Sequence, residues 1–123
     1  MMDPKSPKLL NGARKRCDAA LAATARRGLD DYQSDDLLHS AVERHFEVIG
    51  GALLRLERLD PTTAGRISDY RKIIGFRNRL AHGYDDIDYG QTWEIIHQYL
   101  PVLKSDIEHL LYEWEEHDPE QPE

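Results

Sequence analysis

The chain has 123 residues, of which 40% are hydrophobic and 32% charged, which suits one compact domain and is too few for two of ordinary size. Its formal net charge of −7 argues against a protein that coats nucleic acid through a global positive field, so any nucleic-acid site must be local. A single cysteine, Cys17, excludes an internal disulfide. Because the sequence shows neither a signal peptide nor an apolar span, we expect a cytoplasmic protein without membrane contact.

Two short tails are expected to frame a single helical domain. Residues 1–7 contain Pro4 and Pro7 and are predicted to form a flexible N-terminal tail. Residues 118–123 are acidic, rich in proline and devoid of apolar side chains, so they are predicted to form a flexible C-terminal tail. The domain itself is expected to cover residues 8–117.

The first half of the domain shows the spacing of two helices. Apolar residues recur every three or four positions over 9–24, which predicts a first helix ending near Gly28. The residues at 34–36 then supply N-cap chemistry, and an apolar pattern over 37–59 predicts a second helix. This helix should stop at Asp60-Pro61, because proline disfavours helical geometry in the residue before it.

The second half predicts two further helices. One should begin at Ser68 or Asp69 and run toward Gly83, and the other carries apolar residues over 93–114 with Pro101 inside the pattern. Proline removes a backbone donor, so a kink or split is expected in the turn before it. No segment alternates with period two. The sequence therefore predicts an all-α, antiparallel four-helix bundle.

The third expected helix contains an anomaly at Arg77. Its apolar face is formed by Tyr70, Ile73, Ile74, Leu80, Ala81 and Tyr84. Arg77 lies in the middle of this face. A guanidinium cannot lose its charge and is costly to bury unpaired. Arg77 should therefore either form an ion pair in the core or line a surface left open for a ligand or a subunit.

His82 lies five residues after Arg77, about 140° around an ideal helix, whereas Asn78 shares the face of His82. For Arg77 and His82 to act on one substrate, the helix must distort near Gly83, or two copies must build the site across a two-fold axis. The second arrangement predicts a dimer.

The segment 66–82 is the one basic island in an acidic chain. It holds Arg66, Arg71, Lys72, Arg77 and Arg79 against Asp69 alone. Its side chains are of the kinds that metal-free RNA cleavage uses, because histidine can move the protons of the 2′-hydroxyl reaction and arginine can stabilise charge on the phosphate. Tyrosine can stack on a base or donate to a phosphate.

Plainer interpretations stand beside this one. Glu43 or Glu47 on the second helix could pair with Arg77, which would make the arginine purely structural. His45, in the apolar stripe of the same helix, fits a core or interface position better than a site role.

Metal binding has little support in the sequence. The acidic loop formed by Asp85, Asp86 and Asp88 fits helix capping better than binding of a divalent cation. No pair of the later histidines has the spacing of a zinc site: His97, His109 and His117. We expect neither a metal nor another cofactor.

The run from Arg77 to Tyr84 resembles the R-x4-H-x-Y motif of HEPN-domain toxins of the HepT type. The resemblance continues in 41–50, similar to the family's second helix, and in 93–96 with Leu100-Pro101, similar to its fourth. It spans about residues 37–111. The chain departs from the family pattern at Gly51, where a glutamate is typical.

This resemblance implies a HEPN-like bundle that dimerises with the motif helices facing each other, and metal-independent endoribonuclease activity. Arg77 and His82 match the catalytic pair, and Asn78 matches the polar residue that follows the arginine. Tyr84 matches the tyrosine to which a partner nucleotidyltransferase antitoxin of the MNT type attaches AMP. The expected partners are thus RNA, a second copy of the chain, and this antitoxin. The chain is expected to form a homodimer, with a larger hetero-oligomer of toxin and antitoxin as the alternative.

Arg71, Lys72 and Arg79 are the further candidates for RNA contact, because they belong to the same basic island. Two other functional classes are kept: a catalytically weak or inactive module that binds a nucleotide or its nucleotidyltransferase partner, and a purely structural helical adaptor.

Overall fold

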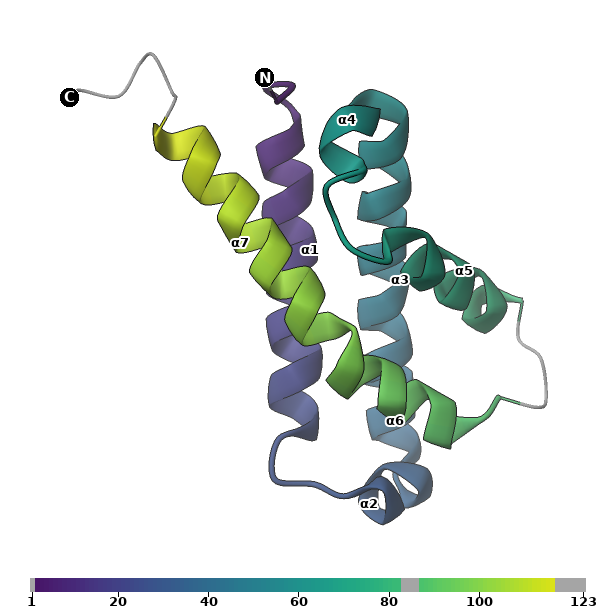
Figure 1. Cartoon of the computed structure of the whole chain (residues 1–123). Helices are drawn as coiled ribbons and strands as arrows, with labels where there is room; N and C mark the ends of the chain where they lie inside the picture. Colours follow the sequence, from purple (N-terminus) through teal and green to yellow (C-terminus); the bar gives the residue numbers. More distant parts are fainter. Residues whose placement is uncertain (1, 83–86, 117–123) are drawn as a thin grey trace.

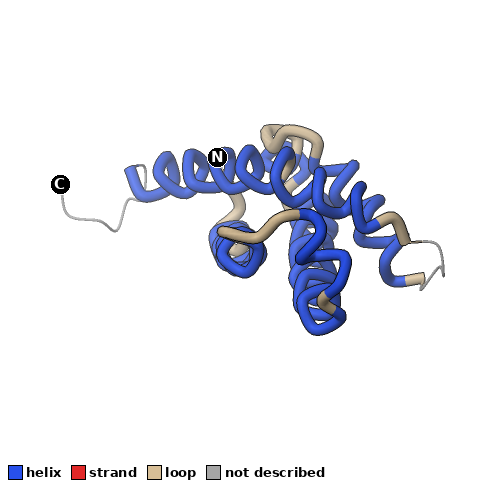
Figure 2. The backbone as a smooth tube through the Cα atoms, turned by 90° about the horizontal axis from the view of Figure 1, so that it is seen from below, coloured by secondary structure: helices blue, strands red, loops and turns tan. Residues whose placement is uncertain are grey.

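The computed structural model describes residues 2–82 and 87–116. Every regular element in these ranges is a helix, and short loops connect the helices (Figure 2). The elements are α1 Ser6–Thr24, α2 Leu29–Ser34, α3 Asp36–Leu59, α4 Pro61–Ala64, α5 Tyr70–Ala81, α6 Tyr89–Gln98 and α7 Leu100–Glu116. The predicted all-α class is confirmed. No helix of the described ranges is long and apolar enough to cross a membrane.

The helices form an antiparallel bundle (Figure 1). Helices α1 and α3 run side by side in opposite directions, and α5 turns back along α3. Helices α6 and α7 follow one another and run in the direction opposite to α5. Helix α7 packs on α1. Because α5 packs mainly on α3, the bundle is open between α5 and α6.

The first helix begins at Ser6, two residues before the predicted start of the domain at residue 8. The buried carboxylate of Asp60 accepts hydrogen bonds from the Ser6 hydroxyl at 2.8 Å and the Asp3 backbone N–H at 2.9 Å. The stretch assigned to a tail therefore joins the packed fold through Asp60. At its other end α1 stops at Thr24 and not near Gly28, because Ala25 is extended and Arg26 is left-handed with a φ of 64°.

The sequence pattern did not predict the two short helices α2 and α4. Tyr32 anchors α2, since its ring is fully buried and meets the His39 ring edge-on at a centroid distance of 4.9 Å. Helix α4 begins at Pro61 and is capped by Asp60, whose carboxylate accepts from the Thr63 N–H at 3.3 Å. Both helices are too short to show an apolar repeat.

The predicted ends of the second helix and the predicted split at Pro101 are confirmed. Asp35 caps α3 by accepting from the Leu38 N–H at 3.1 Å, and α3 ends directly before Asp60. Helices α6 and α7 meet at Tyr99, in the turn before Pro101, where proline cannot supply the N–H that a continuous helix needs.

Helix α5 buries Ile73, Ile74 and Phe76. The Phe76 ring meets the ring of Phe46 on α3 edge-on, with centroids 5.0 Å apart. Ala81, which the helical wheel placed on the apolar face, is exposed. The wheel was wrong there because a residue becomes buried only where a neighbouring element covers it.

Candidate functional site

Arg77 lies at the closest approach of α5 to α3. A Cβ atom placed on Gly50 of α3 would stand 2.5 Å from Cγ of Arg77 and 2.6 Å from its Cβ, which is closer than such atoms can come. Only glycine leaves room for the stem of this arginine. Gly50 therefore fixes where Arg77 sits, and the predicted position of Arg77 in the middle of the packed face is confirmed.

The guanidinium of Arg77 has few partners for a half-buried charge. Its Nη1 donates to Oδ1 of the exposed Asn78 at 3.0 Å, while its Nε is buried without a hydrogen bond. No ion pair joins Arg77 to a carboxylate within residues 2–82 and 87–116. A donor left in this state is costly, so the purely structural interpretation of Arg77 loses its main support.

A small cleft of about 230 Å³ opens beside Arg77 between α3 and α5. It is lined by Ser40, Glu43, Arg44, Glu47, Arg77, Leu80 and Ala81. Glu47, one of the two acids that could have neutralised Arg77, pairs instead with Arg44 at 3.3 Å. We name this the Arg77 cleft.

His82 caps the C-terminal end of α5 and is exposed. Helix α5 stays regular up to this residue: His82 keeps right-handed geometry with φ −81° and ψ −2°, and its N–H donates to the Asn78 carbonyl at 3.2 Å. Because there is no distortion between them, Arg77 and His82 lie on different sides of one helix. The two predicted catalytic residues therefore do not converge through any bend before Gly83.

Gly83 and Tyr84 lie outside the described residues, as do Asp85 and Asp86. The predicted modification site, Tyr84, is thus among the residues outside the described ranges. Asp88 caps α6 by accepting from the Gln91 N–H at 3.1 Å, as the capping interpretation of this loop predicted. The described part of the chain contains no cluster of side chains suited to a metal ion.

Three of the five basic residues of the island pair with carboxylates, two of them with acids from elsewhere in the chain. Arg66 pairs with Glu113 at 2.7 Å, and Arg71 pairs with Glu57 at 3.3 Å. Lys72 lies 3.6 Å from Asp69. Within the described ranges, Arg77 and Arg79 are the members of the island without an ion pair. Of the basic island, two arginines on different sides of α5 therefore carry a positive charge that no carboxylate of the described residues neutralises.

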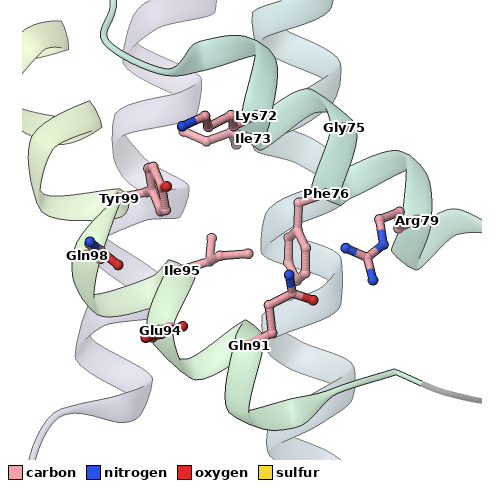
Figure 3. A pocket seen from close by; sticks show the side chains of 10 residues that line it. All are labelled: Lys72, Ile73, Gly75, Phe76, Arg79, Gln91, Glu94, Ile95, Gln98 and Tyr99. Atoms are coloured by element: carbon pink, nitrogen blue, oxygen red, sulfur yellow. The ribbon is translucent and has the colours of Figure 1, made fainter.

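Arg79 and Lys72 both line a second, larger cleft of about 410 Å³ between α5 and α6. Figure 3 shows Phe76 and Arg79 projecting from α5 toward Gln91 and Ile95 on α6. Two of the three predicted RNA-contact residues are therefore brought together, whereas Arg71 is held by Glu57 and by the Tyr70 hydroxyl, 3.2 Å away.

His45 takes no part in either cleft. It is half-buried where α3 faces α1, with its Nδ1 3.3 Å from Nη1 of Arg16. Burial and then the charge of Arg16 lower the pKa of this imidazole. A histidine of this kind is neutral near pH 7 and can accept the arginine N–H, which agrees with the expected packing role.

Gly50 is the residue of the site that sequence reasoning missed. Both Gly50 and Gly51 interrupt a strongly apolar helix at a cost in helix propensity. That unexplained cost was the available signal, but it could not tell which glycine was needed. The structure separates the two, because a Cβ on Gly51 would meet nothing within 4 Å.

Comparison with known proteins finds similarity to one family model and to several proteins described as ribonucleases. The family model described as ribonuclease HepT-like matches residues 14–110. A protein of Caldanaerobacter subterraneus named "Putative RNase" is 25% identical over 79% of this chain and 86% of its own length. One of Methanocaldococcus jannaschii with the same description is 26% identical over 71% of this chain and 74% of its own.

A second M. jannaschii protein, named "Gamma-glutamylcyclotransferase and putative RNase", is 30% identical over 68% of this chain, and the match covers 37% of that protein. No solved structure matches the chain. The family match covers most of the bundle, including α3, α5 and the residues of both clefts. The chain belongs to the ribonuclease HepT-like family.

Proposed function

We propose that this protein is a metal-independent endoribonuclease, the toxin of a toxin–antitoxin pair, with a site composed of Arg77 from one protomer and His82 from its partner. The observation that carries the proposal is the half-buried guanidinium of Arg77, which lines the Arg77 cleft and whose Nε has no hydrogen-bond partner among the described residues. An uncompensated cation of this kind is suited to an anionic ligand. Membership of a ribonuclease family makes the RNA phosphate the first choice.

The chemistry needs one proton acceptor, one proton donor and one cation. A base removes the proton of the 2′-hydroxyl, O2′ forms a bond to phosphorus, and the bond from phosphorus to O5′ breaks as that oxygen gains a proton. The products end in a 2′,3′-cyclic phosphate and a 5′-hydroxyl. His82 is the candidate for the proton transfer, and Arg77 stabilises the charge that grows on the phosphate oxygens.

We propose a dimer because of the positions of Arg77 and His82 on α5. Arg77 faces α3, and His82 follows on another side of a regular helix. Two copies that place their α5 helices against each other can bring the arginine of one beside the histidine of the other. Asn78, bonded to Arg77, orients the guanidinium within such a site.

Regulation by AMP attachment at Tyr84 is the part of the proposal that the resemblance of the motif implies. Tyr84 comes two residues after His82. A phosphodiester with its nucleoside at this position would add negative charge and bulk beside the substrate phosphate. We propose that the partner nucleotidyltransferase silences the nuclease in this way.

Cleavage of a defined single-stranded RNA in EDTA tests the nuclease. We expect the wild type to cut and to leave cyclic phosphate ends, and Arg77→Met and His82→Gln to lose about 100-fold or more in rate. Arg58→Met, at an arginine outside both clefts, is the matched control and should cut normally. If the wild type cuts nothing, or the two site variants cut as fast as it does, the proposal is wrong.

Mixing the two inactive variants tests the composite site. If each site takes its arginine and histidine from different protomers, a mixed dimer of Arg77→Met and His82→Gln regains one intact site of its two. An equal mixture with random exchange should therefore recover about a quarter of wild-type activity. If both residues act within one protomer, the mixture stays inactive, and this outcome would overturn the dimeric site.

The regulatory step is tested by intact mass. Incubation with the partner nucleotidyltransferase and ATP should add one or more AMP units and stop cleavage, and Tyr84→Phe should block both effects. Equal modification of the Tyr84→Phe protein would exclude this tyrosine as the target.

A module that binds a nucleotide or the nucleotidyltransferase without cleaving RNA is the second candidate. It is favoured by Glu43 and Glu47, because these acids line the Arg77 cleft and repel an RNA strand, with its many phosphates, more than a single nucleotide or a protein partner. For this function Arg77→Met should weaken nucleotide or partner binding while the wild type shows no cleavage in EDTA.

A further inference from the structure

We propose that the cleft between α5 and α6, here the α5–α6 cleft, binds one unpaired RNA base beside His82. This inference rests on the proposed nuclease function and adds to it the subsite that receives a base of the substrate. Figure 3 shows the side chains that line it, among them Phe76, Arg79, Gln91, Ile95 and Tyr99.

The size and the walls of the cleft suit a flat heteroaromatic ring. Its volume of about 410 Å³ lies in the range of small-molecule sites, about 300–1,000 Å³. Phe76 and Ile95 supply apolar walls from the two helices (Figure 3). Tyr99 adds a half-buried ring, with Nζ of Lys72 5.9 Å from its centroid. Unpaired RNA bases bind on aromatic and cationic side chains of this kind.

The polar groups of the cleft are free to read the edge of a base. The side chains of Arg79, Gln91 and Gln98 form no hydrogen bond or ion pair within the described part of the chain. Amide groups both donate and accept, and the Glu94 carboxylate accepts the N–H groups that most bases present. These are the functions that recognise the Watson–Crick edge of a base taken out of its stack.

Electrostatics favours RNA on this side of α5. Arg79 is one of the two cations of the basic island without an ion pair among the described residues, and it stands at the α5–α6 cleft. The Arg77 cleft on the other side is lined by the two acids Glu43 and Glu47 together with Arg44. The α5–α6 cleft has Glu94 as its one lining carboxylate. On this side of α5, an RNA strand approaching the acidic chain therefore meets its best charge complementarity over Arg79.

The register of α5 connects the cleft to His82. Gly75, Arg79 and His82 stand at positions i, i+4 and i+7, which is one stripe of a helix. Arg79 and His82 are separated by only about 4.5 Å along the helix axis. A base held in the cleft therefore places its own phosphate near Arg79 and the neighbouring linkage within reach of His82. Such a strand approaches His82 from the side of α5 away from the same protomer's Arg77.

Gly75 gives a direct way to fill the cleft. It lies on the cleft wall, is exposed, and a Cβ added there would meet nothing within 4 Å. Gly75→Leu should place a side chain in the space meant for the base, and Gly75→Ala is the matched control that changes the helix in the same way. The probe is a fluorescent RNA hexamer, 2′-O-methylated at every position so that it cannot be cleaved.

We expect the hexamer to bind the wild type and Gly75→Ala equally and Gly75→Leu at least 10-fold more weakly. Arg79→Gln and Gln91→Ala, which alter exposed or half-buried side chains, should weaken binding without loss of fold and serve if Gly75→Leu does not fold. Equal binding by all these variants, or no binding by the wild type, would overturn the proposal. So would a change of oligomeric state in Gly75→Leu, since the cleft would then be an interface between copies.

These experiments distinguish failure of the base site from failure of the proposed nuclease function. If Gly75→Leu cleaves and binds like the wild type, the base site is wrong and the nuclease stands. If the wild type does not cleave but the hexamer binds and Gly75→Leu weakens it, the nuclease fails and the base site stands.

Discussion

The buried carboxylate of Asp60 and the half-buried guanidinium of Arg77 differ in how fully the fold supplies their hydrogen-bond partners. The carboxylate of Asp60 accepts hydrogen bonds from Asp3, Ser6 and Thr63 at 2.7–3.3 Å. Burial raises its pKa, yet the hydrogen bonds from Thr63, Asp3 and Ser6 outweigh burial and hold the pKa below its ordinary value. Within residues 2–82 and 87–116, Arg77 has one side-chain hydrogen bond, to Asn78, and its buried Nε has none.

We propose that this difference separates a structural charge, Asp60, from a functional one, Arg77. A buried ion whose lone pairs are all satisfied ties chain segments together, and Asp60 joins the start of α1 to α4. A buried donor without a partner lowers stability, so its presence needs another reason, which a ligand supplies. The comparison predicts that changes at Asp60 act on stability and changes around Arg77 act on chemistry.

Asp60→Ala is expected to have the largest effect on the free energy of unfolding. It strips partners from the donors of Asp3, Ser6 and Thr63 and should cost about 3 kcal/mol, measured by urea unfolding followed by circular dichroism. Cleavage per folded molecule should stay as in the wild type. As a control, Arg77→Met should change stability by less than about 1 kcal/mol, since it removes an unpaired charge and keeps the packed stem. Equal losses at the two positions would end the distinction.

Gly50→Ala should have the next largest effect and should change both properties. The added methyl group forces α5 away from α3, and overpacking of this kind costs about 1–3 kcal/mol. The displacement moves the Arg77 guanidinium, so the cleavage rate of the folded protein should fall by about 100-fold with little change in KM. Unfolding curves and single-turnover rates on one preparation measure both. An unchanged rate would show that the position of Arg77 is not set by Gly50.

Gly51→Ala is the matched change at the next residue and should have a smaller effect of opposite sign. Its Cβ would point into open space, so it should gain up to about 1 kcal/mol from helix propensity and leave cleavage unchanged. A loss of activity here as large as in Gly50→Ala would mean that the α3 backbone, and not its contact with Arg77, controls the site.

The smallest effect is the pH dependence of stability through Asp60. Its pKa in the folded protein is below the ordinary value, so the unfolded chain takes up the proton first and its contribution to stability is lost as the pH falls below about 4. Urea midpoints of the wild type and Asp60→Asn should therefore differ near pH 7 and converge in acid. A constant difference across this range would show that the carboxylate charge contributes nothing.

Much of the fold could be predicted from the sequence because it rests on local rules. The apolar repeat every three or four residues gave the long helices, Asp35 and Asp88 cap the starts of α3 and α6, and proline ended α3 and split the last helix at Tyr99. The position of Arg77 on an apolar face was also visible, since it depends only on helical spacing.

Tertiary structure alone decided what surrounds those residues. The contact of Arg77 with Gly50, and the pairing of Arg66 with Glu113 and of Arg71 with Glu57, join positions far apart in the chain. Burial of Tyr32 in the bundle stabilises helix α2. The hydrogen bond from the Ser6 hydroxyl to Asp60 holds the start of α1. Propensity and spacing act over a few residues, whereas burial and ion pairing depend on which helices meet, and only the packed bundle determines that.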